Sequence, residues 1–427
     1  MNKKVLLLLA FSIHFVAFSQ DLDYARQIVK KLASPEFKGR GYIENGDKIG
    51  AEYISNEFSN FGLLPINRKT YFQKFNISVN TLPNNLIVRI DDIELKAAVD
   101  YLVESSCPSV HGKFQIIKID RSRIDTEAKL ISLINKADDS FIFIDNRDKK
   151  NEKPDVSKRI DDYLQLLKSS PEISIKGIII YTNDKLTWES STTQNIRPVV
   201  IINKELDIYN LNSIEINIDA KFIPKYETQN IIGSIKGSSN SDSMIVVIAH
   251  YDHLGKMGKD TYFPGANDNA SGIAMILNLA KHYSKIKPKY TMVFIALSGE
   301  ELGLLGAKKF TENPLIDLTK IKFLVNFDLA GTGEEGIRIV NGTIFNEKFN
   351  LISKINQQQH LLPKVDIRGA ACNSDHCYFY EKGVPCFYIY TQGGIRAYHD
   401  IYDKYETLPF TEFVDYCNLM IVFFDSI

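Results

Sequence analysis

The chain has 427 residues, which is long for a single domain and predicts two or three domains. With 44% hydrophobic and 24% charged residues, it has the composition of a globular protein, which excludes a disordered or fibrous chain. The formal net charge is -1 and no long basic run is present. Nucleic acid is therefore not expected as a partner, because phosphate binding depends on clustered Lys and Arg.

Residues 1–19 are predicted to form a secretory signal peptide. Two lysines precede an apolar run that begins at Val5, and Ala17 and Ser19 form a small-residue cleavage site. The alternative is a membrane anchor, but the run is short for a bilayer span and contains His14. We therefore expect an exported protein, periplasmic or secreted, with no stable membrane association after cleavage.

The chain contains five cysteines, so at least one thiol stays free in any set of disulfides. Export would permit disulfides, and Cys372 and Cys377 are close enough in sequence to pair, although the sequence leaves that pairing open. No CxxC pair occurs, which argues against a zinc site made only of cysteines.

Two regions of different character follow the leader. From Leu22 to about Leu64, apolar residues recur every three or four positions, which predicts two helices, the second of them ended by Gly62. Residues 73–222 hold only two of the 24 glycines, and short β-rich runs alternate there with helical stretches. This segment is predicted to be a separate small α/β unit. It contains no cluster of His, Cys or paired acids, so we expect this segment to have a binding role or to control access to a site elsewhere in the chain.

From residue 223 to 427, apolar strands alternate with helices, as in "SMIVVIAH", "SGIAMILNLAKHYSK" and "YTMVFIALSG". A strand that is apolar throughout is buried on both faces, and its alternation with helices indicates an α/β sheet covered on both sides. The pattern predicts a three-layer sandwich with a central, mixed and mostly parallel β-sheet.

Histidines and acidic residues follow these strands at the points where the strands end. In open α/β sheets the ligand crevice lies outside the carboxyl ends of the strands, so these side chains should meet at one edge. The residues are His250 and Asp252, Glu300 and Glu301, Asp328, and His399 after Tyr398, with Asp268 in a loop that enters a helix at the same edge.

Each of these residues has an ordinary explanation when taken singly. His250 would be a hydrogen-bonded histidine at a strand end, and Asp268 a helix cap. Glu300 and Glu301 would be first-turn acids favoured by the helix dipole, and Asp328 a turn residue. Their coincidence at one edge favours a shared site instead.

The residue types at this edge fit a zinc centre. Two imidazoles and several carboxylates suit Zn²⁺, and a zinc site without Cys and with room for water is catalytic rather than structural. There are enough acids for two ions that share one carboxylate, as in paired-metal aminopeptidases. Because Glu300 and Glu301 are neighbours that point in different directions, one can be a ligand while the other takes a proton from the attacking water.

Together the motifs resemble the secreted co-catalytic di-zinc exopeptidases, a family that includes bacterial leucyl aminopeptidases, aminopeptidase Y and the glutamate carboxypeptidases. The matching pieces occur in the family's order and are "AHYDHLG", "PGANDNASG", "ALSGEELGLLGAKKF", "NFDLAG", "NSDHCYF" and "YHDIYD". The resemblance implies a phosphorylase/hydrolase-like zinc exopeptidase fold. Residues 20–72 would be its N-terminal helices, residues 223–427 its zinc peptidase domain, and residues 73–222 an inserted protease-associated-like domain.

The resemblance also implies a ligand set for two zinc ions. One ion would be bound by His250 and Asp328, the other by Glu301 and His399, and Asp268 would bridge both.

The remaining roles that the resemblance implies concern catalysis and support. Glu300 would be the general base, Asp252 would fix the ring of His250, and Tyr398 would donate a hydrogen bond to the oxyanion. Ser374 would support His399. Arg368 lies where some aminopeptidases place a substrate-binding arginine.

The sequence departs from the family pattern at two positions. Asp400 stands where the family usually has Thr or Ser after its last histidine, although the acid at Asp403 is in place. His253 is an extra histidine, and it stands apart from the predicted ligands, as do His282 and His360. Neither departure removes a ligand, but both would alter the charge around the site.

The predicted function is that of a zinc-dependent aminopeptidase acting on peptides. The alternatives are a carboxypeptidase of the glutamate carboxypeptidase type, a glutaminyl cyclase on the same scaffold with one zinc ion, and a receptor-like member without metals. The presence of every expected ligand argues against the last. Side-chain preference and oligomeric state are not encoded in any pattern of the sequence.

Overall fold

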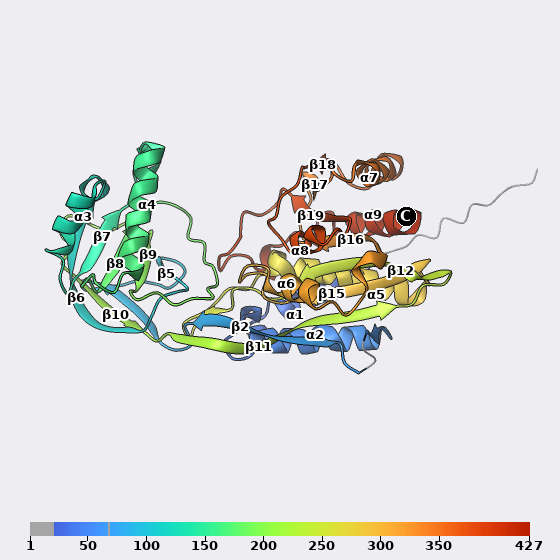
Figure 1. Ribbon diagram of the computed structural model, residues 1–427, viewed down its shortest axis with the longest axis horizontal. Helices are drawn as coiled ribbons and strands as arrows, with labels where there is room; N and C mark the ends of the chain where they lie inside the picture. The colour runs from blue at the N-terminus through green and yellow to red at the C-terminus, as the bar shows by residue number, and fades with distance from the viewer. Residues whose placement is uncertain (1–20, 67–68) are drawn as a thin grey trace, which may run out of the picture.

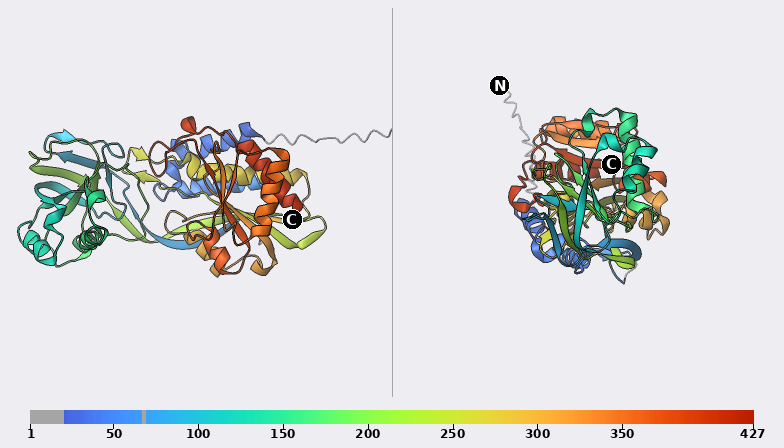
Figure 2. Two further views of the ribbon diagram at one scale, coloured as in Figure 1. Left: turned by 90° about the horizontal axis from the view of Figure 1, so that it is seen from above. Right: turned by 90° about the vertical axis from the view of Figure 1, so that its left-hand side faces the viewer.

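The computed structural model describes residues 21–66 and 69–427, so the predicted signal peptide lies outside the described residues. The chain forms two lobes that lie end to end along the long axis of the molecule (Figure 1; Figure 2). A long antiparallel ribbon of β2 (Phe72–Thr81) and β11 (Lys221–Ile235) runs from one lobe into the other. Within the described part of the chain, no helix is long and apolar enough to cross a bilayer.

The larger lobe is built on a nine-stranded mixed sheet. Its four central strands, in the order β15-β12-β16-β19, are parallel, and antiparallel pairings flank them on both sides. The strands besides β2 and β11 are β1 (Leu64–Pro65), β12 (Asn240–His250), β15 (Tyr290–Leu297), β16 (Ile321–Phe327), β17 (Gly336–Val340), β18 (Val365–Ile367) and β19 (Cys386–Gln392).

Helices cover both faces of this sheet, which confirms the predicted three-layer arrangement. Along β12, Ile245, Val247 and Ala249 belong to one hydrophobic core, and Val246 and Ile248 belong to another. This alternation follows from the two-residue period of a strand. The first core includes α1 (Leu22–Leu32), α2 (Gly46–Asn60), α5 (Gly272–Lys285), α7 (Asn346–Gln359) and α9 (Phe413–Ser426), and the second includes α6 (Leu305–Glu312) and α8 (His376–Glu381).

Local signals set the two predicted N-terminal helices. The Asp21 side chain accepts a hydrogen bond from the backbone N–H of Tyr24 and caps α1. After α2 ends, Gly62 takes a positive φ of 72°, a conformation that glycine adopts at little cost. Both helices pack on the large sheet and extend the core of this lobe.

The second lobe contains an eight-stranded sheet with the order β4-β3-β10-β6-β7-β8-β9-β5. Helices α3 (Glu127–Ile134) and α4 (Pro154–Ser169) pack on one face of it. The core on the other face also includes Leu254, Met257 and Phe263 of the larger lobe, so the lobes share packed surface. The strands are β3 (Leu86–Ile90), β4 (Ile93–Glu94), β5 (Tyr101–Val103), β6 (Val110–Asp120), β7 (Phe141–Asp145), β8 (Gly177–Tyr181), β9 (Val199–Ile202) and β10 (Ser213–Ile218).

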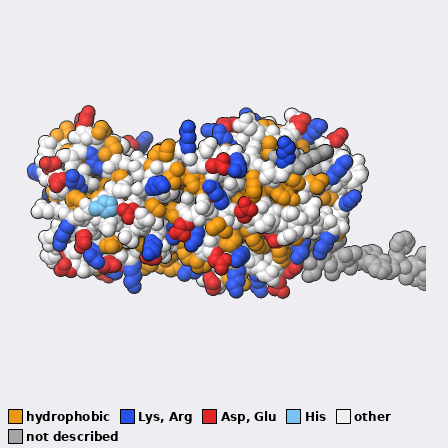
Figure 3. All heavy atoms as spheres, turned by 90° about the horizontal axis from the view of Figure 1, so that it is seen from below, with side chains coloured by type: hydrophobic (Ala, Val, Ile, Leu, Met, Phe, Trp, Pro, Cys, Tyr) orange, Lys and Arg blue, Asp and Glu red, His pale blue; other side chains and the backbone are white. Residues whose placement is uncertain are grey.

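The surface carries charges of both signs. On the face in Figure 3, Lys and Arg side chains are interspersed with Asp and Glu, and no extended basic patch covers that face. This distribution agrees with the near-neutral net charge of the sequence.

Candidate metal centre

The predicted site residues meet at the carboxyl edge of the four parallel strands. His250 ends β12, Glu300 and Glu301 follow β15, and Asp328 follows β16. His399 lies in the loop after β19. Because neighbouring parallel strands end at the same edge, segments far apart in sequence deliver their side chains to one place.

The Asp268 carboxylate lies between two histidines at the centre of the cluster. Its Oδ1 is 3.5 Å from Nε2 of His250, and its Oδ2 is 3.2 Å from Nε2 of His399. The His250 Nε2 also lies 3.5 Å from Oδ1 of Asp328, and the His399 Nε2 lies 3.3 Å from Oε2 of Glu301. The five residues predicted as metal ligands are thus brought together.

The turn at Ala266–Ser271 places Asp268 without using it as the helix cap. The carboxamide of Asn269 accepts a hydrogen bond from the N–H of Gly272, the first residue of α5, so Asn269 does the capping. Asp403 accepts hydrogen bonds from the N–H groups of Asn267 and Asp268 at 2.8 and 2.9 Å. The Asp268 carboxylate is therefore free to face the histidines.

Asp252 is linked to both His250 and Glu300. The contact at Nδ1 of His250 is the main-chain oxygen of Asp252 at 3.1 Å, whereas its carboxylate lies 3.9 Å away. That buried carboxylate accepts hydrogen bonds from the N–H of Glu300 at 3.2 Å and from the Tyr42 hydroxyl at 2.9 Å. Asp252 thus orients the His250 ring through its backbone and the Glu300 segment through its side chain.

His253 was expected to stand apart, and this expectation is wrong. Its Nδ1 lies 2.6 Å from Oε1 of Glu301, and the side chain is completely buried. Glu301 therefore divides its two oxygens between His253 and His399. The sequence signal was the position of His253 three residues after His250, in the loop that follows β12.

The expected support of His399 by Ser374 is also wrong. The Ser374 hydroxyl donates to Oδ2 of Asp328 at 3.3 Å and accepts from the Asn326 amide at 2.8 Å. Ser374 begins the turn that leads into α8, which packs beside β16, so it supports the ligand at the end of that strand.

The other predicted residues lie nearer the surface or beside the site. The Tyr398 ring stacks on the His399 ring with centroids 3.9 Å apart. Arg368 is exposed, and its Nη1 lies 3.4 Å from the Tyr390 hydroxyl. Cys372 and Cys377 form a disulfide that joins the segment before α8 to its first turn, and the other three cysteines are free and buried.

Burial and mutual repulsion dominate the electrostatics of the cluster. Burial raises the pKa of Glu300 well above its ordinary value, and the carboxylates of Asp375 and Asp328 add to that rise. Burial also raises the pKa of Glu301 well above its ordinary value. For Asp268, burial raises the pKa, but the surrounding imidazoles outweigh it and the net pKa is lowered. Such a concentration of carboxylates is stabilised by cations.

Two buried groups at this edge were not identified from the sequence. Arg40 is fully buried and donates hydrogen bonds to main-chain oxygens of Tyr251, Pro264, Gly265 and Asp268. It lies in the turn-rich connection between the first two helices, where no pattern indicates a role.

Asp375 is the second of these groups. It is fully buried, and neither of its carboxylate oxygens has a hydrogen-bond partner in residues 21–66 or 69–427. Burial raises its pKa to about 8. It occurs inside the "NSDHCYF" piece, but no strand-end position marks it as part of the site.

The arrangement fits a zinc centre on two counts. Two candidate ligand groups share Asp268, one with His250 and Asp328 and one with His253 and Glu301, and the ligand atoms of each group lie within 4.8 Å of one another. Oδ1 of Asp328 is buried and has no hydrogen-bond partner among the residues that the structure describes. Imidazole nitrogen and carboxylate oxygen are ligands that Zn²⁺ accepts.

Comparisons with known sequences agree with this chemistry. Residues 230–423 match the sequence profile of Peptidase family M28. Aminopeptidase YwaD of Bacillus subtilis is 28% identical over 232 residues, which cover 52% of this chain and 49% of that protein. A probable zinc metalloprotease of Pyrenophora tritici-repentis is 36% identical over 106 residues, 24% of each chain. The chain thus spans less than half the length of these curated relatives in each match.

A solved structure shares the fold across both lobes. BSAP, a zinc aminopeptidase from Bacillus subtilis, superposes with a TM-score of 0.69 at 18% identity, over 95% of this chain and 93% of that chain. At this identity the similarity shows a common fold. Together with the profile match, it confirms the resemblance that the motifs indicated. Residues 230–423 are thus similar in sequence to Peptidase family M28, and the fold of the chain is similar to that of a zinc aminopeptidase.

Proposed function

We propose that this protein is a zinc-dependent aminopeptidase that removes N-terminal residues from peptides. The observation that carries the proposal is that the two oxygens of Asp268 face different histidines, His250 at 3.5 Å and His399 at 3.2 Å. A carboxylate in this position suits a bridge between two metal ions. The names of YwaD and BSAP support an aminopeptidase among the exopeptidases.

The ligands divide into two sets around Asp268. His250 and Asp328 would hold one zinc ion, and Glu301 and His399 would hold the other. Bound zinc would lower the pKa of a water molecule and polarise the carbonyl of the scissile peptide bond. Asp252 and Ser374 would keep His250 and Asp328 in position, because ligands of metal ions depend on such partners.

Glu300 would be the general base. Its carboxylate would accept the proton of the attacking water and then pass it to the leaving amine. The burial that raises its pKa supports this role, because a carboxylate of higher pKa is a stronger proton acceptor. The Tyr398 hydroxyl would donate a hydrogen bond to the oxyanion of the tetrahedral intermediate.

A panel of peptides with free and blocked termini tests this function. We expect hydrolysis only of peptides with a free N-terminus, loss of activity with a chelator, and recovery with zinc. Hydrolysis of N-terminally blocked peptides that requires a free C-terminus would instead assign a carboxypeptidase. Cyclisation of an N-terminal glutamine without hydrolysis would assign a glutaminyl cyclase.

We also propose that residues 1–19 direct export and are removed, and that residues 73–222 are a protease-associated-like insert that controls access to the site. The disulfide between Cys372 and Cys377 supports an oxidising compartment. Mass spectrometry of the protein secreted from its host would give the N-terminus, and an intact residue 1 would refute the cleavage.

A further inference from the structure

One loop of the second lobe touches the loop that carries His399. This clamp loop, residues 183–196, connects β8 to β9. The N–H of Trp188 donates to the main-chain oxygen of His399 at 2.8 Å. The Lys185 ammonium donates to the main-chain oxygens of Arg396 and Tyr398 at 2.9 and 3.1 Å. Two residues of the second lobe, Lys185 and Trp188, therefore hold the backbone at a proposed metal ligand and just before it.

Lys185 also forms an ion pair with Asp400, the residue that departs from the family pattern. Its Nζ lies 2.5 Å from Oδ2 of Asp400, whose side chain is only 4% exposed. Oδ1 of the same carboxylate accepts a hydrogen bond from the N–H of Tyr402 at 2.8 Å. Asp400 thus shapes the turn after His399, and its charge is balanced from the other lobe.

The backbone at His399 needs such support. Its φ is +52°, in the left-handed region that residues other than glycine adopt at a cost. Conformations of this kind persist where the surrounding contacts fix them. The contacts on either side of His399 come from Lys185, Trp188 and Asp400.

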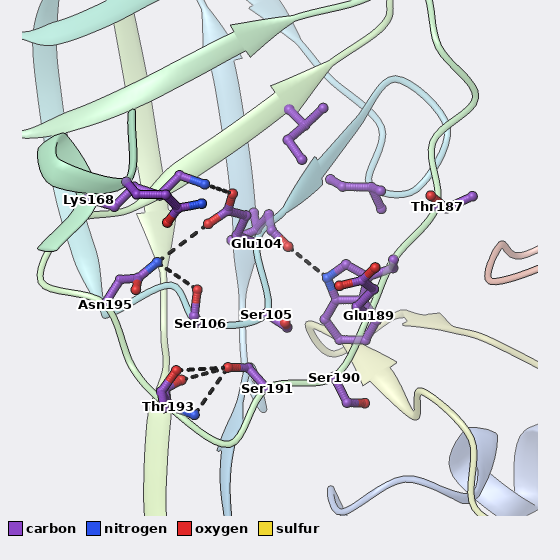
Figure 4. A pocket seen from close by; sticks show the side chains of 15 residues that line it. Glu104, Ser105, Ser106, Lys168, Thr187, Glu189, Ser190, Ser191, Thr193 and Asn195 are labelled. Carbon is purple, nitrogen blue, oxygen red and sulfur yellow. Dashed lines mark hydrogen bonds and ion pairs between the residues drawn. The ribbon is translucent and has the colours of Figure 1, made fainter. Parts of the chain in front are cut away.

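The clamp loop is itself firmly attached. The Trp188 ring stacks on Phe263 of the larger lobe with centroids 4.8 Å apart, and its Nε1 donates to the Val103 oxygen at 2.7 Å. Further along the loop, the Asn195 amide donates to the Ser106 hydroxyl at 2.7 Å (Figure 4). Phe263 begins the segment that leads to Asp268, so Trp188 contacts the segments that carry two proposed ligands.

We propose that the second lobe supports the metal centre, with Lys185 as a positioning residue that holds His399 through Asp400 and the loop backbone. The proposal rests on the proposed function only for its catalytic consequence. Lys185 itself is half-exposed and touches no proposed ligand side chain, so it acts through the loop. Reciprocally, metal bound by His399 would stabilise the contact between the lobes.

The chain provides its own probe of this contact, because Trp188 is its single tryptophan and its buried ring stacks on Phe263 of the larger lobe. In the zinc-loaded wild type we expect a blue-shifted tryptophan emission, and a red shift on zinc removal as the loop loosens. Lys185→Met should show the red-shifted emission with zinc present. It should also release zinc to a chelator about tenfold faster, the lower range for loss of a partner behind a metal ligand.

Matched variants separate positioning from a general loss of stability. Lys204→Met removes a similar ion pair with Asp100 in the same lobe and should leave emission and zinc release unchanged. Lys185→Arg keeps the cation and should therefore show the emission and the zinc release of the wild type. The double variant Lys185→Met/Asp400→Asn should show a smaller red shift and slower zinc release than Lys185→Met alone, because no unpaired buried carboxylate remains.

Emission and zinc release are measured without substrate, so they test the clamp even if the protein has no aminopeptidase activity. If the protein is active, kcat of Lys185→Met should fall about tenfold while Lys204→Met keeps the wild-type value. Zinc release and emission of Lys185→Met equal to those of the wild type would overturn the proposal. A kcat loss with unchanged zinc release would also overturn it, because His399 would then be held without Lys185.

Discussion

The guanidinium of Arg40 lies under the backbone of Asp268, with Nη2 donating to the main-chain oxygen at 3.2 Å. The same side chain donates to the oxygens of Tyr251, Leu32, Pro264 and Gly265. One buried cation thus joins the end of β12, the first helix and the turn that presents the central carboxylate. The N-terminal helices are therefore tied directly to the proposed metal centre.

Replacing Arg40 should damage both stability and metal binding. Arg40→Met leaves buried carbonyl oxygens without donors, and we expect a loss of about 3 kcal/mol in the free energy of unfolding. Zinc affinity should fall as well, because the turn that presents Asp268 loses its support. Urea denaturation and zinc titration measure the two effects.

Arg197→Met is the matched control for Arg40. Arg197 is also buried and donates only to main-chain oxygens, those of Leu167, Ser170 and Ile175 in the second lobe. The Arg197→Met substitution should lower the free energy of unfolding and leave zinc affinity unchanged. Equal losses of zinc affinity in both variants would contradict a specific role of Arg40.

Glu300→Gln should abolish turnover while zinc stays bound. The substitution keeps the shape of the side chain but removes the proton acceptor, and general bases contribute about 10²- to 10⁴-fold to rates. Steady-state kinetics and metal analysis of the same sample check this expectation. The exposed Glu312→Gln should behave as the wild type. A rate for Glu300→Gln close to that of the wild type would reject Glu300 as the base.

Asp268→Asn should lower the zinc content from two ions per chain to less than one. The amide retains one acceptor oxygen but no charge, so it cannot bridge two cations, and both ligand sets lose their shared member. Metal analysis after dialysis gives the stoichiometry. Asp366→Asn, on β18 away from the centre, serves as the control. Two tightly bound ions in Asp268→Asn would refute the bridge.

His253→Gln should weaken the zinc set that contains Glu301 and spare the other set. His253 contacts Oε1 of Glu301 at 2.6 Å, and loss of such a partner typically costs about 10- to 100-fold in metal affinity. Stepwise zinc titration should therefore show one weakened and one unchanged binding step. Two unchanged steps would leave His253 without a role in holding Glu301.

A buried carboxylate outside the metal centre gives a prediction for pH. Asp47 accepts hydrogen bonds from Tyr226 and Thr228, and burial raises its pKa from 3.8 to about 6. Between these two values the folded state binds the proton more tightly than the unfolded state. The stabilising effect of the proton is present at low pH and is lost as pH rises through 6.

Asp47→Asn removes this titration. We therefore expect the unfolding free energy of the wild type, relative to Asp47→Asn, to fall by about 2 kcal/mol between pH 4.5 and pH 7. Urea denaturation of the metal-free proteins at the two pH values measures the difference. A difference that does not change with pH would show that Asp47 titrates normally in the folded protein.

Much of the larger lobe could be predicted because its signals are local. The continuous apolar runs that end at His250 and Leu297 indicate buried parallel strands, and they form β12 and β15. The position of Asp328 directly after a third such run places it at the same edge. The ribbon of β2 and β11 was not predicted, because pairing between distant segments leaves no periodic signal within either of them.

The sequence by itself determined the kinds of elements and the residues that end each strand, because hydrophobic period and strand-end position are properties of short segments. Only the tertiary structure decided which side chains contact one another around the site. Ser374 supports Asp328, His253 contacts Glu301, and Lys185 reaches Asp400 from the other lobe. These pairs are separated by 46, 48 and 215 positions in sequence, so their contacts depend on how sheets, helices and lobes pack.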